Sequence, residues 1–156
     1  MADWHHRFMD MAAQAAEWSK DPRRRVGAVI VDTRNRVIST GYNGFPRGVD
    51  DSPAILTNRE EKLRRVIHAE ANALLFAQRS VEGCTLYVTY PPCAQCTAML
   101  IQAGIGRVVY PKGINRSPRR AADWATAHEM LSEVRIPVIE LELPAGTHNA
   151  DIQGAA

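Results

Sequence analysis

One histidine, one glutamate and two cysteines lie in two short segments of the sequence and could together perform chemistry. His68 and Glu70 belong to the stretch "VIHAEANALL", and Cys93 and Cys96 belong to "PPCAQC". Imidazole and thiolate are ligands that zinc prefers, and a glutamate beside them can move protons. The pattern therefore indicates either a structural zinc site or a reaction centre, and the number of metal ligands distinguishes the two.

The ligand count favours an open metal site. Cys93 and Cys96 stand three positions apart at the start of an expected helix, where both thiols point the same way and the helix dipole favours thiolates. With His68 they make three ligands, whereas a structural zinc site has four protein ligands. Cys84 begins an expected strand and fits a buried structural cysteine better than a fourth ligand. We predict one zinc ion per chain, with a position left for water.

Glu70 gains a role beside a metal with three protein ligands. Taken alone, it could be a solvated glutamate in the first turn of a helix, where the helix dipole favours it. It lies, however, in the mostly apolar run "HAEANALLFA", where burying a carboxylate without a task is costly. Zinc lowers the pKa of its bound water, and Glu70 could carry protons from that water to a ring nitrogen and to a departing amine. This chemistry is hydrolytic deamination.

Length and composition indicate one globular domain. The chain has 156 residues, 46% of them apolar and 23% charged, and we place the domain at residues 1–143 with a disordered tail at 144–156. The apolar runs are shorter than the roughly 20 residues of a membrane helix, and the first segment lacks the apolar core of a signal peptide. We therefore expect a cytoplasmic protein without a membrane partner. Three cysteines do not make a disulfide framework, and a C-x-x-C pair in a reducing compartment is more often metal-binding or redox-active.

The hydrophobic pattern predicts helices that alternate with strands. Apolar residues at helical spacing favour a first helix, and the β-branched run "VGAVIVD" favours a buried strand that returns as a hairpin. Residues 44–58 are expected to form a loop. The segment 59–80 is one helix or two, and the site favours a new start near His68.

The order of these elements predicts the fold class. Helices between the later strands imply crossover connections, which make those strands parallel. We predict an α/β fold with three α-β-α layers around a five-stranded mixed sheet whose last strands are parallel. The expected helices are residues 4–19, 59–80, 93–104 and 121–134, and the expected strands are residues 26–32, 37–43, 84–90, 107–111 and 136–143.

These motifs and three further segments resemble the deoxycytidylate (dCMP) deaminase family of the cytidine/deoxycytidylate zinc deaminases. The combination H-x-E with P-C-x-x-C is the signature of zinc deaminases. The segments "SKDPRRRVGAVIVD", "GYNGFPRG" and "QAGIGRVVYP" resemble the dCMP branch, and the similarity runs from Trp4 to Leu143. The resemblance implies a cytidine-deaminase-like fold and hydrolysis of dCMP to dUMP and ammonia. Zinc-activated water would attack C4 while Glu70 shuttles protons.

The resemblance also implies contacts to the substrate. Asn43 of "GYNG" would hydrogen-bond the sugar or its phosphate, although it also fits a turn asparagine. Gly27 and Ala28 would lie under the pyrimidine ring, where small residues permit close approach. For the 5′-phosphate we expect the loop after strand 107–111, because ligands bind beyond the carboxyl ends of strands in open α/β sheets. The candidates in this loop are Lys112, Asn115 and Arg116.

Regulation and assembly are implied by the resemblance alone. Many members of the family are activated by dCTP and inhibited by dTTP near the "GYNG" loop, and many are oligomers. We therefore expect a homo-oligomer with dCTP and dTTP as candidate effectors. The candidate effector contacts are Arg23, Arg24, Gly44 and Arg47.

Three alternatives stay open at this point. A deaminase of tRNA or single-stranded nucleic acid would share the chemistry but needs a basic groove and stacking aromatics, and 6% aromatic residues with a net charge of +2 do not favour it. A deaminase of another small nucleobase or nucleoside would differ only in its substrate pocket. A non-catalytic zinc module explains the three ligands but leaves Glu70 without a function.

Overall fold

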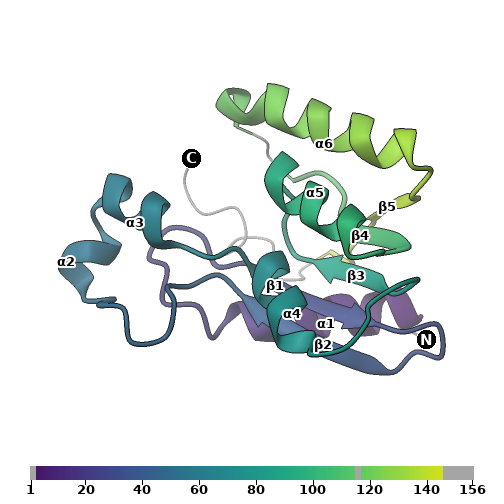
Figure 1. Cartoon of the computed structure of the whole chain (residues 1–156), viewed down its shortest axis with the longest axis horizontal. Coiled ribbons are helices and arrows are strands. Elements are labelled where there is room, and N and C mark those ends of the chain that lie inside the picture. The colour runs from purple at the N-terminus through teal and green to yellow at the C-terminus, as the bar shows by residue number, and fades with distance from the viewer. Residues whose placement is uncertain (1–2, 115–116, 146–156) are drawn as a thin grey trace.

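The computed structural model describes residues 3–114 and 117–145 of the chain (Figure 1). Helices and strands alternate along most of it, as the hydrophobic pattern predicts. The helices are α1 (Trp4–Ala16), α2 (Pro53–Leu56), α3 (Arg59–Arg65), α4 (Ala69–Ala77), α5 (Ala94–Gln102), the 3₁₀ helix η1 (Pro118–Arg120) and α6 (Ala121–Glu133). The strands are β1 (Gly27–Val31), β2 (Val37–Tyr42), β3 (Thr85–Val88), β4 (Arg107–Pro111) and β5 (Val138–Leu141).

The strands form one mixed sheet in the order β2-β1-β3-β4-β5. Strand β1 pairs antiparallel with both β2 and β3. Strands β3, β4 and β5 are parallel because α5 and α6 connect them as crossovers. The prediction of a five-stranded mixed sheet with parallel last strands is confirmed.

Helices cover both faces of this sheet (Figure 1). Ala28 and Ile30 of β1 belong to the core under α4, α5 and α6. Val29 and Val31 belong to the opposite core, under α1. Side chains alternate between the two faces of a strand, and helices cover both faces at β1, so all five of its residues are buried. The predicted α-β-α layering is confirmed.

The segment between β2 and β3 contains one helix that was not expected, and it settles whether residues 59–80 form one helix or two. A short helix, α2, lies within residues 44–58, and the expected helix over 59–80 is divided into α3 and α4. Val66 ends α3 in an extended conformation, and Ile67 forms a β-bridge with Gly44 before α4 begins. The interruption confirms the preferred new helix start near His68.

Two glycines permit close packing of helices on the sheet. A Cβ atom at Gly27 would clash with the backbone of Ala12 and Ala16 in α1. A Cβ atom at Gly41 would clash in the same way with the backbone of α4, at Ala69 and Ala73. The contacts of Gly27 fix the distance between the sheet and α1, and those of Gly41 fix the distance between the sheet and the start of α4.

Among the described residues, no helix combines the length and the apolar character needed to cross a membrane. The expected disordered tail falls almost wholly on residues 146–156, which lie outside the described part of the chain.

Candidate metal centre and active-site cavity

The starts of two helices bring a histidine and two cysteines together. His68 is the N-cap residue of α4, and Cys93 is the N-cap residue of α5. The Nδ1 atom of His68 lies 3.6 Å from the Sγ atom of Cys93 and 3.4 Å from that of Cys96. All three donor atoms lie within 4.8 Å of one another. The sequence-predicted ligands therefore form one cluster.

The cluster fits a zinc ion. With Zn–S near 2.3 Å and Zn–N near 2.0–2.1 Å, a tetrahedral site places sulfur and nitrogen ligands about 3.6 Å apart. The distances from His68 to both cysteines match this edge. Within residues 3–114 and 117–145, no fourth histidine, cysteine or carboxylate joins the group. The donor set is that of a site with one position left for a non-protein ligand.

The other cysteine and a late histidine have different surroundings. Cys84 is buried in the core beneath α4, α5 and α6, as expected of a structural cysteine. His128 of α6 lies 3.0 Å from the hydroxyl of Tyr110 through its Nε2 atom. Neither side chain belongs to the metal cluster.

Hydrogen bonds within the cluster shift the pKa values of its members. The Cys96 thiol hydrogen-bonds Cys93 and lowers the pKa of Cys93 to about 4, with further help from His68 and the Cys96 backbone amide. The same bond raises the pKa of Cys96. The hydrogen bond to Cys93 also raises the pKa of His68. These shifts favour a thiolate at Cys93, and a divalent cation would favour a second thiolate at Cys96.

Glu70 lies in the first turn of α4 and is only 4% exposed. Burial raises the pKa of its carboxyl group to about 7, and the charge on His68 opposes the shift. A carboxyl group with a pKa near neutrality can both accept and return a proton at physiological pH. It lines the same cavity as His68 and Cys93.

Local contacts hold both helix starts in place. The Gly44–Ile67 bridge fixes the backbone directly before His68, through N–H to carbonyl bonds of 3.1 and 2.8 Å. The carboxylate of Asp123 in α6 accepts a hydrogen bond of 3.2 Å from the backbone amide of Ala94, which begins α5. The metal cluster is therefore supported by contacts from a neighbouring loop and a neighbouring helix.

A cavity of about 530 Å³ opens beside the cluster. Six of the side chains that line it are cationic, whereas Asp21 and Glu70 are its acidic residues. The cationic residues are Arg23, Arg24, Arg59, Lys62, Arg119 and Arg120. A cavity that joins a metal cluster, a buried carboxyl group and an excess of positive charge suits an anionic substrate.

Three expected substrate contacts have other roles in the structure. Asn43 lines the cavity, but its amide accepts a hydrogen bond from the Val26 amide (2.8 Å) and donates one to the Arg24 carbonyl (2.9 Å). Gly27 and Ala28 are buried and do not line the cavity. That they lie under a pyrimidine ring stays a prediction, and the small size of Gly27 also accommodates the backbone of α1.

The expected phosphate loop is only partly described. Asn115 and Arg116 lie outside the described residues. Lys112 does not line the cavity and forms an exposed ion pair of 2.7 Å with Glu142. Arg119 and Arg120, a few positions further along the chain, do line the cavity. Among the described residues of this region, the cationic side chains that line the cavity therefore come from η1 and not from the end of β4.

The four candidate effector contacts do not form one site. Arg23 and Arg24 line the main cavity. Gly44 lines a smaller cavity of about 160 Å³, which also contains Trp18 and Tyr42. Arg47 lies over the ring of Phe76 in α4, with 5.3 Å between the guanidinium carbon and the ring centroid. Arg23 and Arg24 therefore line the same cavity as the metal ligands His68 and Cys93.

Comparison with known proteins agrees with this geometry. Residues 2–112 match the family described as the cytidine and deoxycytidylate deaminase zinc-binding region. The chain belongs to the cytidine and deoxycytidylate deaminase family. The prediction of this family, and with it of a deaminase, is confirmed.

Individual members of the family cover most of the chain. An uncharacterized deaminase in the luxG 3′ region of Aliivibrio fischeri is 48% identical over 112 residues, which are 72% of this chain and 75% of the relative. A probable deoxycytidylate deaminase of Caenorhabditis elegans is 37% identical over 145 residues, which are 90% of this chain and 71% of the relative.

A solved structure of the family shares the fold. The dCMP deaminase from the cyanophage S-TIM5, in complex with dCMP and dUMP, has a TM-score of 0.69 and 28% sequence identity. The match covers 87% of this chain and 95% of that chain. It confirms the predicted cytidine-deaminase-like fold.

Several cavity residues of this deaminase were missed in the sequence. Asp21 and Lys62 are 41 positions apart and have no common motif. Tyr90 precedes "PPCAQC" and resembles an ordinary strand aromatic. The arginines of "RSPRR" follow strand 107–111, so the rule for strand ends indicated their region but not their positions.

Proposed function

We propose that this chain deaminates dCMP to dUMP, with His68, Cys93 and Cys96 holding one zinc ion and Glu70 moving the protons. The observation that carries the proposal is the common cavity. His68 and Cys93 of the metal cluster, a buried carboxyl group with a pKa of about 7 and an excess of cationic side chains all face it. The relatives named deoxycytidylate deaminase, and the similar structure that holds dCMP and dUMP, support this substrate.

The chemistry follows from the position of Glu70. Bound zinc would supply an activated water molecule for attack on C4 of the cytosine ring. Glu70, held in an apolar environment beside this centre, would accept a proton from the attacking water and deliver it to the ring nitrogen. It would then take the proton of the hydroxyl group added to C4 and pass it to the departing amine, so that ammonia leaves as the C4 carbonyl forms. The balance is dCMP and water to dUMP and ammonia, so no other reactant is needed.

The arginines of the cavity are our candidates for the 5′-phosphate. Arg23, Arg24 and Arg120 line it on two different segments. In the described part of the chain, neither these residues nor Arg59 and Arg119 take part in an ion pair. A guanidinium group without a carboxylate partner is free to bind a phosphate through two parallel hydrogen bonds. This assignment replaces Lys112, whose ammonium group is paired with Glu142.

A substrate panel tests the proposal. Zinc-loaded protein is incubated with dCMP, deoxycytidine, cytidine and a cytosine-containing oligonucleotide, and ammonia release is followed. We expect the highest kcat/KM with dCMP. Turnover of the oligonucleotide alone would overturn the proposal in favour of a nucleic-acid deaminase, and turnover of the nucleosides alone would favour a nucleoside deaminase.

The assembly, the cellular location and the regulation of the protein are also proposed here. We infer a homo-oligomer of single-domain chains (residues 1–143) in the cytoplasm, and three free cysteines are consistent with a reducing compartment. Regulation by dCTP and dTTP is supported by the smaller cavity, where Trp18, Tyr42 and Phe45 could stack on a base. Titration of both nucleotides during dCMP turnover tests regulation, and an unchanged rate would exclude it.

A further inference from the structure

An ion pair with little exposure to solvent lies next to two of the cavity arginines, and both of its residues line the same cavity. The Nζ atom of Lys62 lies 3.1 Å from both carboxylate oxygens of Asp21. Each of the two side chains is only 10% exposed. Replacing such a pair by apolar residues is often neutral or stabilising, because desolvation offsets much of the attraction. Stability alone is therefore a weak explanation for this pair.

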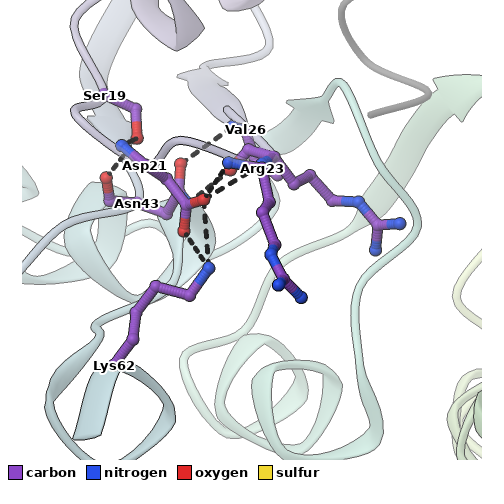
Figure 2. Close-up of polar contacts among 7 residues, drawn as sticks. Ser19, Asp21, Arg23, Val26, Asn43 and Lys62 are labelled. Carbon is purple, nitrogen blue, oxygen red and sulfur yellow. Dashed lines mark hydrogen bonds and ion pairs between the residues drawn. The ribbon is translucent and has the colours of Figure 1, made fainter. Parts of the chain in front are cut away.

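The Asp21 carboxylate organises the backbone of the residues that follow it (Figure 2). Its Oδ1 atom accepts hydrogen bonds from the amides of Arg23 (2.8 Å) and Arg24 (3.0 Å), in addition to the bond from Lys62. The hydroxyl of Ser19 accepts a bond of 3.2 Å from the Asp21 amide. A single carboxylate thus fixes the turn from which both arginine side chains extend.

Two further contacts hold Arg24, and a third holds the backbone shortly after it. Its carbonyl accepts a hydrogen bond of 2.9 Å from the amide side chain of Asn43. The next residue but one, Val26, donates from its backbone to the same side chain. The guanidinium carbon of Arg24 lies 4.2 Å from the centroid of the Tyr90 ring. Backbone and side chain are therefore positioned in advance, while the guanidinium group has no carboxylate partner in the part of the chain that the structure describes.

Lys62 has a separate task in this arrangement. An unpaired Asp21 carboxylate would repel a phosphate in the cavity and attract the neighbouring guanidinium groups to itself. Lys62 comes from α3 and neutralises this carboxylate from the side. Asp21 can therefore fix the turn while its ion pair is with Lys62, and the guanidinium groups of the two arginines stay available for a phosphate.

We propose that Asp21 and Lys62 are positioning residues, which hold Arg23 and Arg24 for the 5′-phosphate and thereby set the preference for a nucleotide over a nucleoside. The inference rests on the proposed dCMP deaminase activity. The physical basis is preorganisation, because protein side chains that are already fixed lose little conformational freedom when a ligand binds. The reacting cytosine ring lies at the metal cluster in this proposal, so the pair acts on binding of the phosphate and not on proton transfer.

The test compares dCMP with deoxycytidine in wild type and in Asp21→Asn. The variant keeps a similar shape but removes the charge that holds Lys62. We expect the KM for dCMP to rise about ten- to a hundredfold, as for other misplaced binding groups, while kcat falls much less. The ratio of kcat/KM for dCMP to that for deoxycytidine should fall by the same factor. Asp21→Glu, which keeps the charge, should restore part of this ratio.

A neighbouring ion pair supplies the matched control. Lys20 and Asp51 form an exposed pair of 2.7 Å next to this turn, with side-chain exposures of 70% and 42%. Asp51 lines the smaller cavity proposed for the effectors, so the rates are measured without dCTP or dTTP. Asp51→Asn removes a carboxylate in the same way but leaves the Asp21 turn intact, so the substrate ratio should then stay at the wild-type value. Zinc content and the thermal midpoint are measured for every variant.

The outcomes separate a failure of the positioning role from a failure of the proposed function. An unchanged substrate ratio in Asp21→Asn, or equal losses with both substrates, overturns the positioning role. If Asp21→Asn does not fold, Asp21→Asn/Lys62→Met removes both charges together and should show the same loss of preference. A wild-type enzyme that does not prefer dCMP to deoxycytidine would instead overturn the proposed function itself.

Discussion

The Nδ1 atom of His68 lies 3.4 Å from the Sγ atom of Cys96, although 28 positions separate the two residues in the chain. The contact exists because α4 and α5 begin at neighbouring points on one face of the sheet, with His68 and Cys93 as their N-cap residues. A helix start exposes backbone amides and favours negative charge, so this is a suitable place for thiolates. Zinc binding would therefore join two helices as well as provide a reaction centre.

Removal of the Glu70 carboxylate should stop turnover but leave the metal bound. Glu70→Gln keeps the size of the side chain and removes the group that accepts protons. We expect kcat for dCMP to fall by about 10²–10⁴-fold or more, as for other general acid–base residues. Steady-state kinetics and zinc analysis on the same sample measure both effects. Full activity in this variant would exclude the proton-transfer role.

Removal of the metal should lower both activity and stability. A ligand that binds only the folded state stabilises it, by about 4 kcal/mol when its free concentration is a thousand times Kd. Treatment with a chelator should therefore abolish dCMP turnover and lower the thermal midpoint, and added zinc should restore both. Because Glu70 is not a proposed ligand, Glu70→Gln should show the same drop in midpoint, whereas Cys96→Ser should show little. Equal activity before and after chelation would contradict the metal assignment.

The metal ligands could be predicted from the sequence because each lies at a helix start within a short motif. Local rules sufficed there: the spacing of Cys93 and Cys96, and the break before His68, each depend on a few neighbouring residues. The alternation of helices and strands was predictable for the same reason, and it determined the sheet order through crossover connections.

The substrate end of the cavity could not be predicted in this way. Asp21 and Lys62 meet only because α3 packs against the turn before β1, and no periodic pattern indicates that contact. The resemblance to the dCMP deaminases led to the prediction that Gly27 lies under the pyrimidine ring of the substrate. The tertiary contact with α1 explains its size, and this contact cannot be seen in a linear sequence.

Gly27→Ala separates these two explanations. Its new Cβ atom would clash with the backbone of α1, so we expect a loss of about 1–3 kcal/mol in the free energy of unfolding, as in other overpacked cores. The KM for dCMP should change little in the protein that remains folded. Gly44→Ala is the control, because a Cβ atom there meets no atom within 4 Å. A raised KM without loss of stability would return Gly27 to the substrate pocket.

The turn between β1 and β2 should make stability depend on pH in the acid range. Hydrogen bonds from the backbone and side chain of Arg36, together with one from the Arg34 amide, lower the pKa of Asp32 to about 2 from a usual value of 3.8. A lowered pKa in the folded state gives stability that is complete above about pH 4 and lost as the pH falls toward 2. Asp32→Asn should therefore be less stable than wild type at pH 7.

Urea unfolding of both proteins at several pH values measures this difference, with the metal removed from each. The gap between wild type and Asp32→Asn should narrow below pH 3.8 and close near pH 2. A gap that is independent of pH would show that the Asp32 charge does not contribute through these hydrogen bonds.

Substitution of Tyr90 should show whether the ring beneath Arg24 contributes to phosphate binding. The ring centroid lies 4.2 Å from the guanidinium carbon, and such contacts contribute about 1 kcal/mol when partly shielded from water. Tyr90→Leu removes the aromatic face and should raise the KM for dCMP about fivefold, the factor that corresponds to 1 kcal/mol. The KM for deoxycytidine should change less, because that substrate has no phosphate.

Tyr90→Phe is the matched variant for this experiment. The Tyr90 hydroxyl is buried and has no hydrogen-bond partner among the residues that the structure describes, so its removal leaves the stacked ring in place. We expect a smaller rise in KM than in Tyr90→Leu. If the two variants raised the KM equally, the hydroxyl and not the ring would be the contributing group. If neither changed it, Arg24 would bind phosphate without help from the ring, and its position would depend on Asp21 and Asn43 alone.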